Sequence, residues 1–273
     1  MHSLTGQWQN NYGSNIYLTY DENSKLISGT YHSETGATGT YYFVGYCSPI
    51  SAKPDAASAQ HFGLGQNIGW SLFWRPINAD PQDYNSSWHW VTTQVGQYFV
   101  NKQGEECLYL IQSLLATSAF PGIASKGNYP EAITFKRISH SFDRTDNPNL
   151  ANLTSPVLAN AINQNWHCPA LSADMLLSAL DTDDKYGWIK GKLILTNEDV
   201  ALIGFTDIHK LDNSEQALCL TGYSTKRAQI IAINGVMDST NSKLTCSVWL
   251  GNATPFSHRY VQVSLENWHF ENE

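Results

Sequence analysis

The sequence predicts an all-β protein: an up-and-down eight-stranded antiparallel β-barrel followed by a second, mainly β domain with short connecting helices. Two observations lead to this fold class. Across residues 4–138, short alternating apolar segments are separated by turn residues at intervals of roughly 8–15 residues. Charged residues make up only 15% of the chain, and the Asn, Gln, Ser and Thr that supply its polarity favour strands and turns over helix interiors.

Short turns join the strands that we expect in the first barrel. In residues 14–20, Ile16, Leu18 and Tyr20 alternate on one face, and residues 101–104 (NKQG) have the composition of a hairpin turn. Because each strand then pairs with the next along the chain, the topology is that of an up-and-down barrel. Further strands are expected at residues 26–33, 39–47, 65–75, 88–100, 106–115 and 131–138.

The chain divides into a barrel over residues 1–138, a polar linker over residues 139–154 and a second β domain over residues 155–273. Ser155 and Pro156 have the pattern of a helix N-cap followed by proline at the first helical position. Helices are therefore expected after Pro156 and again from Ser172. Strands are expected at residues 188–195, 200–207, 218–225, 229–237, 244–252 and 260–270.

Charge and motif content argue against several function classes. The formal net charge is −8 and no basic cluster is present, so no nucleic-acid partner is expected. No apolar run reaches the ~20 residues of a membrane span, so no membrane partner is expected. The five cysteines form no C-x-x-C pair, and we predict neither a metal site nor a cofactor. Recognised catalytic motifs are absent, so we expect the pocket to bind and not to react, although this absence does not exclude an enzyme.

Five segments of the first half resemble the avidin/streptavidin family in order and spacing. They are residues 4–14 (LTGQWQNNYGS), 28–33 (SGTYHS), 68–74 (IGWSLFW), 92–98 (TTQVGQY) and 112–115 (QSLL). The resemblance covers about residues 4–138, and it implies a barrel whose open end holds biotin. It also implies a secreted or extracellular protein, although no signal peptide is recognised in this chain, and either a homo-oligomer or pairing of two barrels within the chain.

The resemblance also implies a ligand site. The positions matching the family's contacts to the ureido oxygen are Asn10, Ser14 and Tyr31, and converging donors of this kind suit a carbonyl oxygen. Ser33 matches an acceptor for a ureido N–H, and Trp74 matches a wall of the pocket. The complete set of expected ligand-binding residues is Asn10, Tyr12, Ser14, Tyr31, Ser33, Thr35, Trp74, Trp90, Thr92, Gln94, Ser113 and Leu115.

Departures from the family pattern weaken the implied pocket. Gln94 and Ser113 stand where the family has wall tryptophans, and Trp90 stands where it has a serine that contacts the ligand's carboxylate. The last-strand Asp or Asn matches either Ile133 or Glu131, and strand parity does not decide between them. Trp88 and Trp90 add aromatic surface on one face of a strand. They either line the pocket or pack at a strand end that contacts another subunit.

We therefore expect a small-molecule binding protein that takes biotin weakly or takes a different organic ligand. One alternative is a cofactor-free, pericyclic-type cyclase that folds a hydrophobic substrate in the barrel, and another is a sugar-binding module. In the second half, residues 218–223 (LCLTGY) and 247–252 (SVWLGN) weakly repeat motifs of the first. This similarity indicates a degenerate second barrel, and an unrelated β-sandwich is the alternative.

Overall fold

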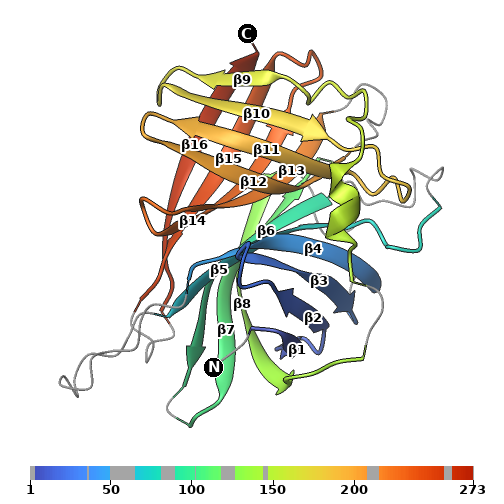
Figure 1. The fold of residues 1–273 in the computed structure, drawn as a ribbon, viewed down its shortest axis with the longest axis vertical. Coiled ribbons are helices and arrows are strands. Elements are labelled where there is room, and N and C mark those ends of the chain that lie inside the picture. Colours follow the sequence, from blue (N-terminus) through green and yellow to red (C-terminus); the bar gives the residue numbers. More distant parts are fainter. Residues whose placement is uncertain are drawn as a thin grey trace.

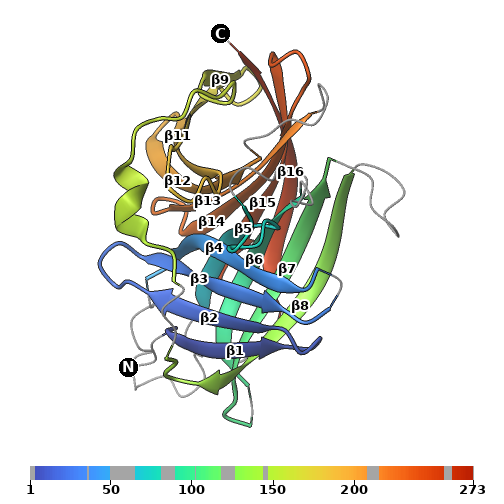
Figure 2. The ribbon, with the colours of Figure 1, turned by 90° about the vertical axis from the view of Figure 1, so that its right-hand side faces the viewer.

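Two closed β-barrels make up the protein. The computed structural model describes residues 4–35, 37–49, 65–80, 90–101, 103–117, 127–143, 147–207, 215–254 and 260–272. Figure 1 shows the barrel of the N-terminal half below and that of the C-terminal half above, and Figure 2 shows the upper strands closing on themselves. The all-β prediction is confirmed. The second half is a barrel, so the β-sandwich alternative is wrong.

In the first barrel, each strand pairs with the next and the last pairs with the first. Its strands are β1 (Gly6–Asn10), β2 (Asn15–Tyr20), β3 (Leu26–Ser33), β4 (Gly39–Cys47), β5 (Gln66–Phe73), β6 (Trp90–Val100), β7 (Glu106–Ala116) and β8 (Gly127–Ser139). Trp88, which was expected in the sixth strand, lies outside the described residues.

The second barrel repeats this topology, because β9 closes it by pairing with both β10 and β16. Its strands are β9 (Asn165–Cys168), β10 (Ala173–Ala179), β11 (Trp188–Leu195), β12 (Glu198–Thr206), β13 (Gln216–Ser224), β14 (Gln229–Met237), β15 (Lys243–Asn252) and β16 (Gln262–Asn272). In the described part of the chain, no helix is long and apolar enough to cross a membrane.

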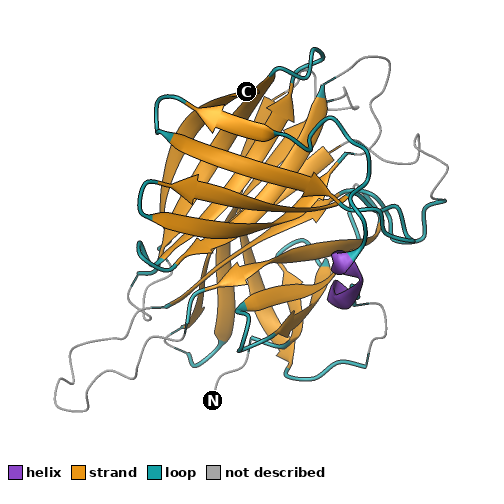
Figure 3. Cartoon of the chain, turned by 45° about the horizontal axis from the view of Figure 1, so that its top comes forward, coloured by secondary structure: helices purple, strands orange, loops and turns teal. Residues whose placement is uncertain are grey.

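The connecting helices expected after Pro156 and from Ser172 are wrong. Val157 forms an isolated bridge with Leu180, and the segment after Ser172 is strand β10. Met175 and Leu177 are buried whereas Leu176 between them is 42% exposed, so the apolar period here is 2 and not 3.6. The helix that Figure 3 draws in purple is a short 3-10 helix at Leu150–Thr154.

A pair of tryptophans shows that the barrels correspond strand by strand. Trp8 and Trp166 are both fully buried on the first strand of their barrels. Trp8 donates from Nε1 to the carbonyl of Leu4 at 3.2 Å, and Trp166 donates in the same way to Ile162 at 3.0 Å. In each case the acceptor lies four residues upstream, so β9 is the counterpart of β1. The degenerate repeat suggested by the sequence is therefore a structural repeat.

The outer faces of the middle strands join the two barrels. Val44, Phe73, Val91 and Leu115 of the first barrel share one buried apolar cluster with eight residues of the second half. These eight are Leu153, Leu180, Tyr186, Trp188, Ile203, Phe205, Ala217 and Cys219. The arrangement is the intramolecular barrel pairing that the sequence left as one of two possibilities.

Equivalent residues meet at the centre of this interface. The hydroxyls of Ser71 on β5 and Thr221 on β13 lie 2.8 Å apart, and the strand ladders give them the same position in their barrels. A contact between equivalent positions is the signature of an isologous, two-fold interface. Gly69 permits the close approach, because a Cβ there would lie 2.6 Å from Cγ2 of Ile230.

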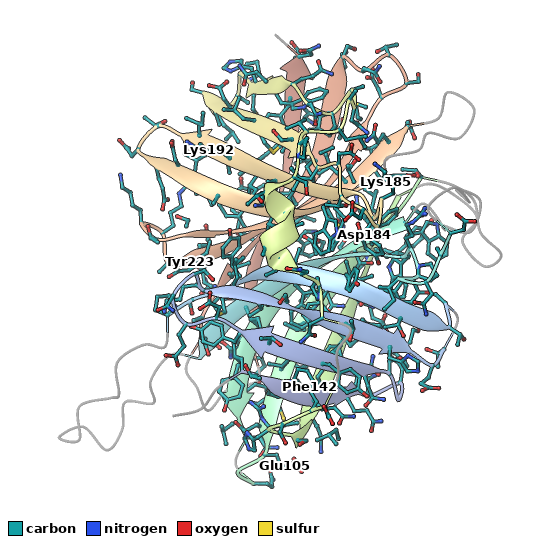
Figure 4. All side chains as sticks on the ribbon, turned by 45° about the vertical axis from the view of Figure 1, so that its right-hand side comes forward. Glu105, Phe142, Asp184, Lys185, Lys192 and Tyr223 are labelled. Atoms are coloured by element: carbon teal, nitrogen blue, oxygen red, sulfur yellow. The ribbon has the colours of Figure 1, made fainter. Side chains whose placement is uncertain are left out.

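The segment between the barrels packs against the first of them. The ring of Phe142, labelled in Figure 4, lies 5.6 Å from that of Tyr17, and Asn147 donates to the hydroxyl of Thr19 at 3.0 Å. Leu153 is buried in the cluster between the barrels. The described part of this segment is therefore part of the packed structure.

We predict that Tyr186→Phe destabilises the whole chain. The buried Tyr186 hydroxyl donates to the carbonyls of Phe73 and Arg75 and accepts from the backbone N–H of Tyr42, so it links the second half to the first barrel. Its loss leaves buried backbone groups unpaired, at a cost of roughly 1–3 kcal/mol. Denaturant titration would measure this loss. Tyr109→Phe is the matched control, because that hydroxyl bonds to no described residue, and equal stability of the two variants would contradict the prediction.

Candidate functional site

A buried polar group forms where the turn between β1 and β2 meets β3. The side-chain oxygen of Asn10 accepts the backbone N–H groups of Tyr12 at 3.0 Å and Ser14 at 2.9 Å, which fixes the turn. The amide nitrogen of Asn10 donates to the hydroxyl of Tyr31 at 3.0 Å. The Ser14 hydroxyl accepts the N–H of Glu34 at 3.3 Å. The turn and β3 therefore bring Asn10, Ser14 and Tyr31 together, as the sequence predicted.

The phenol of Tyr31 stays protonated at neutral pH. Burial raises its pKa above the ordinary value, and hydrogen bonds to Ser14 and Asn10 act in the opposite direction. Because Tyr31 accepts the hydrogen bond from Asn10, its own O–H proton remains for donation. The Ser14 oxygen accepts from Glu34, and the hydrogen bond between Ser14 and Tyr31 uses one of the two hydroxyl protons, so the pair has one O–H left to donate.

Aromatic rings flank the polar group. The ring of Trp74 lies 5.8 Å from that of Tyr31 and 5.0 Å from that of Tyr41, and Phe135 lies 6.4 Å from Tyr31. Trp74 donates from Nε1 to the hydroxyl of Thr92 at 2.8 Å. Edge contacts and this hydrogen bond hold Trp74 in place beside the polar group.

A chain of side-chain amides runs from the barrel interior to its rim. Gln94 donates to Gln112 at 3.1 Å, Gln112 donates to Glu131 at 2.8 Å, and Tyr12 donates to the same carboxylate. Gln94 is buried, Gln112 is half-buried, and Glu131 and Tyr12 are exposed. These side chains face inward, and their exposure to solvent increases from Gln94 to Glu131, so the barrel is open at this end.

The buried end of this series of hydrogen-bonded side chains carries an acceptor without a hydrogen-bond donor. Oε1 of Gln94 has no hydrogen-bond partner among the described residues, and neither has Nε1 of Trp70, which lies on the same inner face. An unpaired buried polar atom costs roughly 1–3 kcal/mol. A ligand that supplied a donor to Gln94 would remove that cost.

Ser113 and Leu115 lie on the outer face, which corrects the inward positions expected for them. The β6–β7 ladder places Ser113 opposite Thr93, whereas Gln112 lies opposite the inward-facing Gln94. The carbonyl of Ser113 accepts from Asn234 of the second barrel at 2.7 Å, and Leu115 packs in the cluster between the barrels. Adjacent residues of a strand point to opposite faces, so Gln112 and not Ser113 faces the barrel interior.

Gln112 is thus the site residue that sequence reasoning missed. On the last strand both Ile133 and Glu131 face inward, so the register does not decide which of them matches the family's last-strand Asp or Asn. Ile133 is fully buried opposite Leu110, and Glu131 lies opposite Gln112 nearer the rim. Only the pairing of β7 with β6 identifies Gln112 as the inward-facing residue.

The remaining expected residues lie around this end of the barrel. Ser33 is buried and donates to the carbonyl of Thr35, which is itself exposed, at 2.9 Å. Trp90 is buried, on the same face of β6 as Thr92 and Gln94, and its carbonyl accepts the N–H of Trp74 at 3.1 Å. Ligand contact by each of these residues stays a prediction. No described group of three or more His, Cys, Asp or Glu could hold a metal ion, and all five cysteines are free and buried.

We predict that Tyr41, which packs against Trp74, limits stability at alkaline pH. Burial raises the pKa of Tyr41 to about 12, whereas a phenol in an unfolded chain titrates near ~10. Above pH ~10 the unfolded chain releases a proton that the folded chain keeps, so the free energy of unfolding falls as pH rises through this window. Denaturation of Tyr41→Phe at pH 9 and about pH 11 should show a smaller fall than the wild type. An unchanged fall, with Tyr109→Phe as control, would contradict this.

Comparison with known proteins finds that the first barrel is similar to one sequence family. The sequence model of the Avidin family matches residues 1–120, which confirms the resemblance seen in the sequence motifs. No curated protein matches the chain. Similar solved structures include Xenavidin, 23% identical over 50% of this chain and 96% of that chain, with a TM-score of 0.35. A biotin binding protein from chicken is 22% identical over 50% and 95% of the two chains, with a TM-score of 0.36.

Proposed function

We propose that the first barrel binds a small organic ligand whose buried end is a carbonyl group, and that biotin is such a ligand, bound weakly. The observation that carries this proposal is the buried group of Asn10, Ser14 and Tyr31. The Tyr31 hydroxyl accepts from Asn10 and the Ser14 hydroxyl accepts from Glu34, and the hydrogen bond between the two hydroxyls uses one of their protons, so one O–H stays for a ligand oxygen. Donors held in place before the ligand arrives bind it without the cost of ordering them.

Further polar groups define the flank of the ligand. The Thr92 hydroxyl accepts from Trp74 and keeps a proton to donate, while Oε1 of Gln94 needs a donor. A ligand with a carbonyl at its buried end and an N–H or O–H group along one side supplies the donor that Gln94 lacks. The ureido ring of biotin has this arrangement of one carbonyl and two N–H groups.

The affinity for biotin should be far below that of the family's tight binders. Gln94 and Gln112 occupy inner positions where a closed pocket needs large aromatic walls. Each such wall buries about 150–250 Å², which at about 25 cal/mol/Å² corresponds to several kcal/mol before binding costs. Ile133 also supplies no acceptor at the deep position of the last strand.

Secretion and self-association are finer parts of the proposal and rest on the family resemblance. The cyclase and the sugar-binding module stay as alternatives, and no contact described above favours either of them.

Calorimetric titration with biotin tests the proposed function. We expect a dissociation constant in the micromolar range or weaker for the wild type. Tyr31→Phe keeps the ring contacts with Trp74 and Phe135 but removes one donor, so affinity should fall about tenfold. Tyr109→Phe, on the outer face, should bind as the wild type does. Equal affinity of Tyr31→Phe and wild type would overturn the role of the polar group, and a nanomolar constant would overturn the account of the missing walls.

A further inference from the structure

The two barrels share their interior positions but not their chemistry. Ile16 lies opposite Tyr31 in the first barrel, and its counterpart Met175 lies opposite Leu193 in the second. By the same ladders, Cys168 and Ala173 occupy the positions of Asn10 and Ser14. The polar group of the first barrel is therefore absent from the second.

The rest of the second interior is apolar in the same way. The positions of Thr92, Gln94 and Gln112 are taken by Ile231, Ile233 and Val248, all fully buried. Trp268 takes the position of Ile133 and fills more of the barrel. A ligand that presents a carbonyl would find no donor at these positions, so the second barrel cannot bind the first barrel's ligand in the same manner.

The second barrel nevertheless has a cavity at the corresponding end. Its volume is about 450 Å³, within the range of about 300–1,000 Å³ typical of small-molecule sites. The lining comes from the β9–β10, β11–β12 and β13–β14 turns and from β16. The lining residues are Leu171, Leu195, Thr196, Asn197, Glu198, Lys226, Arg227, Glu266 and Trp268.

The carboxylates that line this cavity already have partners. Glu198 accepts the hydroxyls of Ser224 and Thr225 and the backbone N–H of Lys226. Glu266 accepts Nε1 of Trp268 at 2.8 Å. These hydrogen bonds hold the turn and the ring in place.

The cations are less fully engaged. Lys226 donates to the carbonyl of Asn197. Arg227 is exposed, and its guanidinium makes no hydrogen bond or ion pair with any residue that the structure describes. The formal charges of the four charged lining residues cancel, but the Arg227 guanidinium is the one charged group among them without a partner in the described part of the chain. It adjoins the apolar surface of Leu171, which is 38% exposed, Leu195 and Trp268.

We propose that the mouth of the second barrel binds a small carboxylic acid with an apolar body. The carboxylate pairs with the Arg227 guanidinium, whose planar donors match two carboxylate oxygens. The apolar body covers Leu171, Leu195 and the edge of Trp268. One chain would then carry two sites of different chemistry, and this second site does not depend on the function proposed for the first barrel.

Ligand-observed NMR and calorimetry on the full chain test this proposal, with 4-phenylbutyrate as the probe and its neutral amide as the matched control ligand. We expect the acid to bind about tenfold more tightly than the amide, and Arg227→Gln to remove that difference. Lys192→Gln, which changes an exposed lysine of the outer wall (Figure 4), should leave it intact.

Leu171→Trp locates the site, because its larger side chain should fill the cavity and weaken acid and amide alike. Tyr31→Phe should leave binding of the acid unchanged, which separates this site from the first barrel. No binding of the acid at millimolar concentration would overturn the proposal. So would equal affinity of Arg227→Gln and wild type, or loss of acid binding in Tyr31→Phe.

Discussion

The alternation of side chains across each strand is the constraint on which the rest of the structure depends. In β4–β6 and β12–β14, one face fills a barrel and the other meets the opposite barrel. All residues of β5 are accordingly buried, although a strand on the wall of an isolated barrel would expose every second side chain. The contact of Ser71 with Thr221, its counterpart, centres the two barrels on each other. Because every position has a fixed face, a change in register would disturb the interiors and the interface together.

Because the interface uses only outward-facing residues, the inward-facing residues of the two barrels can differ without disturbing it. The interface uses outward positions such as Val44 and Ile203, and the ligand chemistry uses inward ones. The first interior keeps Asn10, Ser14 and Tyr31 linked by hydrogen bonds, with an amide chain leading to the rim. The second has lost every donor of that group and keeps charged residues only at its mouth. The shared fold thus accounts for how the barrels pair, and the inward residues of each account for what it can bind.

Much of the first barrel could be predicted from sequence, because its turns are marked by polar residues and its motifs have fixed spacing. The polar group could be predicted for the same reason. The register at Gln112 and Ser113 could not, since two adjacent polar residues give no apolar alternation and only pairing with β6 separates them. The segment after Ser172 satisfies helical and strand spacing alike, and pairing of β10 with β9 and β11 decides for the strand. Long-range pairing of this kind is not encoded locally.

Among the described residues, the buried donors that suit a neutral carbonyl lie inside the first barrel and not inside the second. Hydrogen–deuterium exchange with and without millimolar biotin tests it most directly, because it reads both barrels in one experiment. The account predicts slower exchange in peptides that cover residues 10–14, 31–35 and 92–94. It predicts no change in the counterpart peptides at residues 231–233 and 246–248, which lie inside the second barrel and not at its mouth. Slower exchange in the second set, or no change in the first at a concentration that saturates binding, would contradict it.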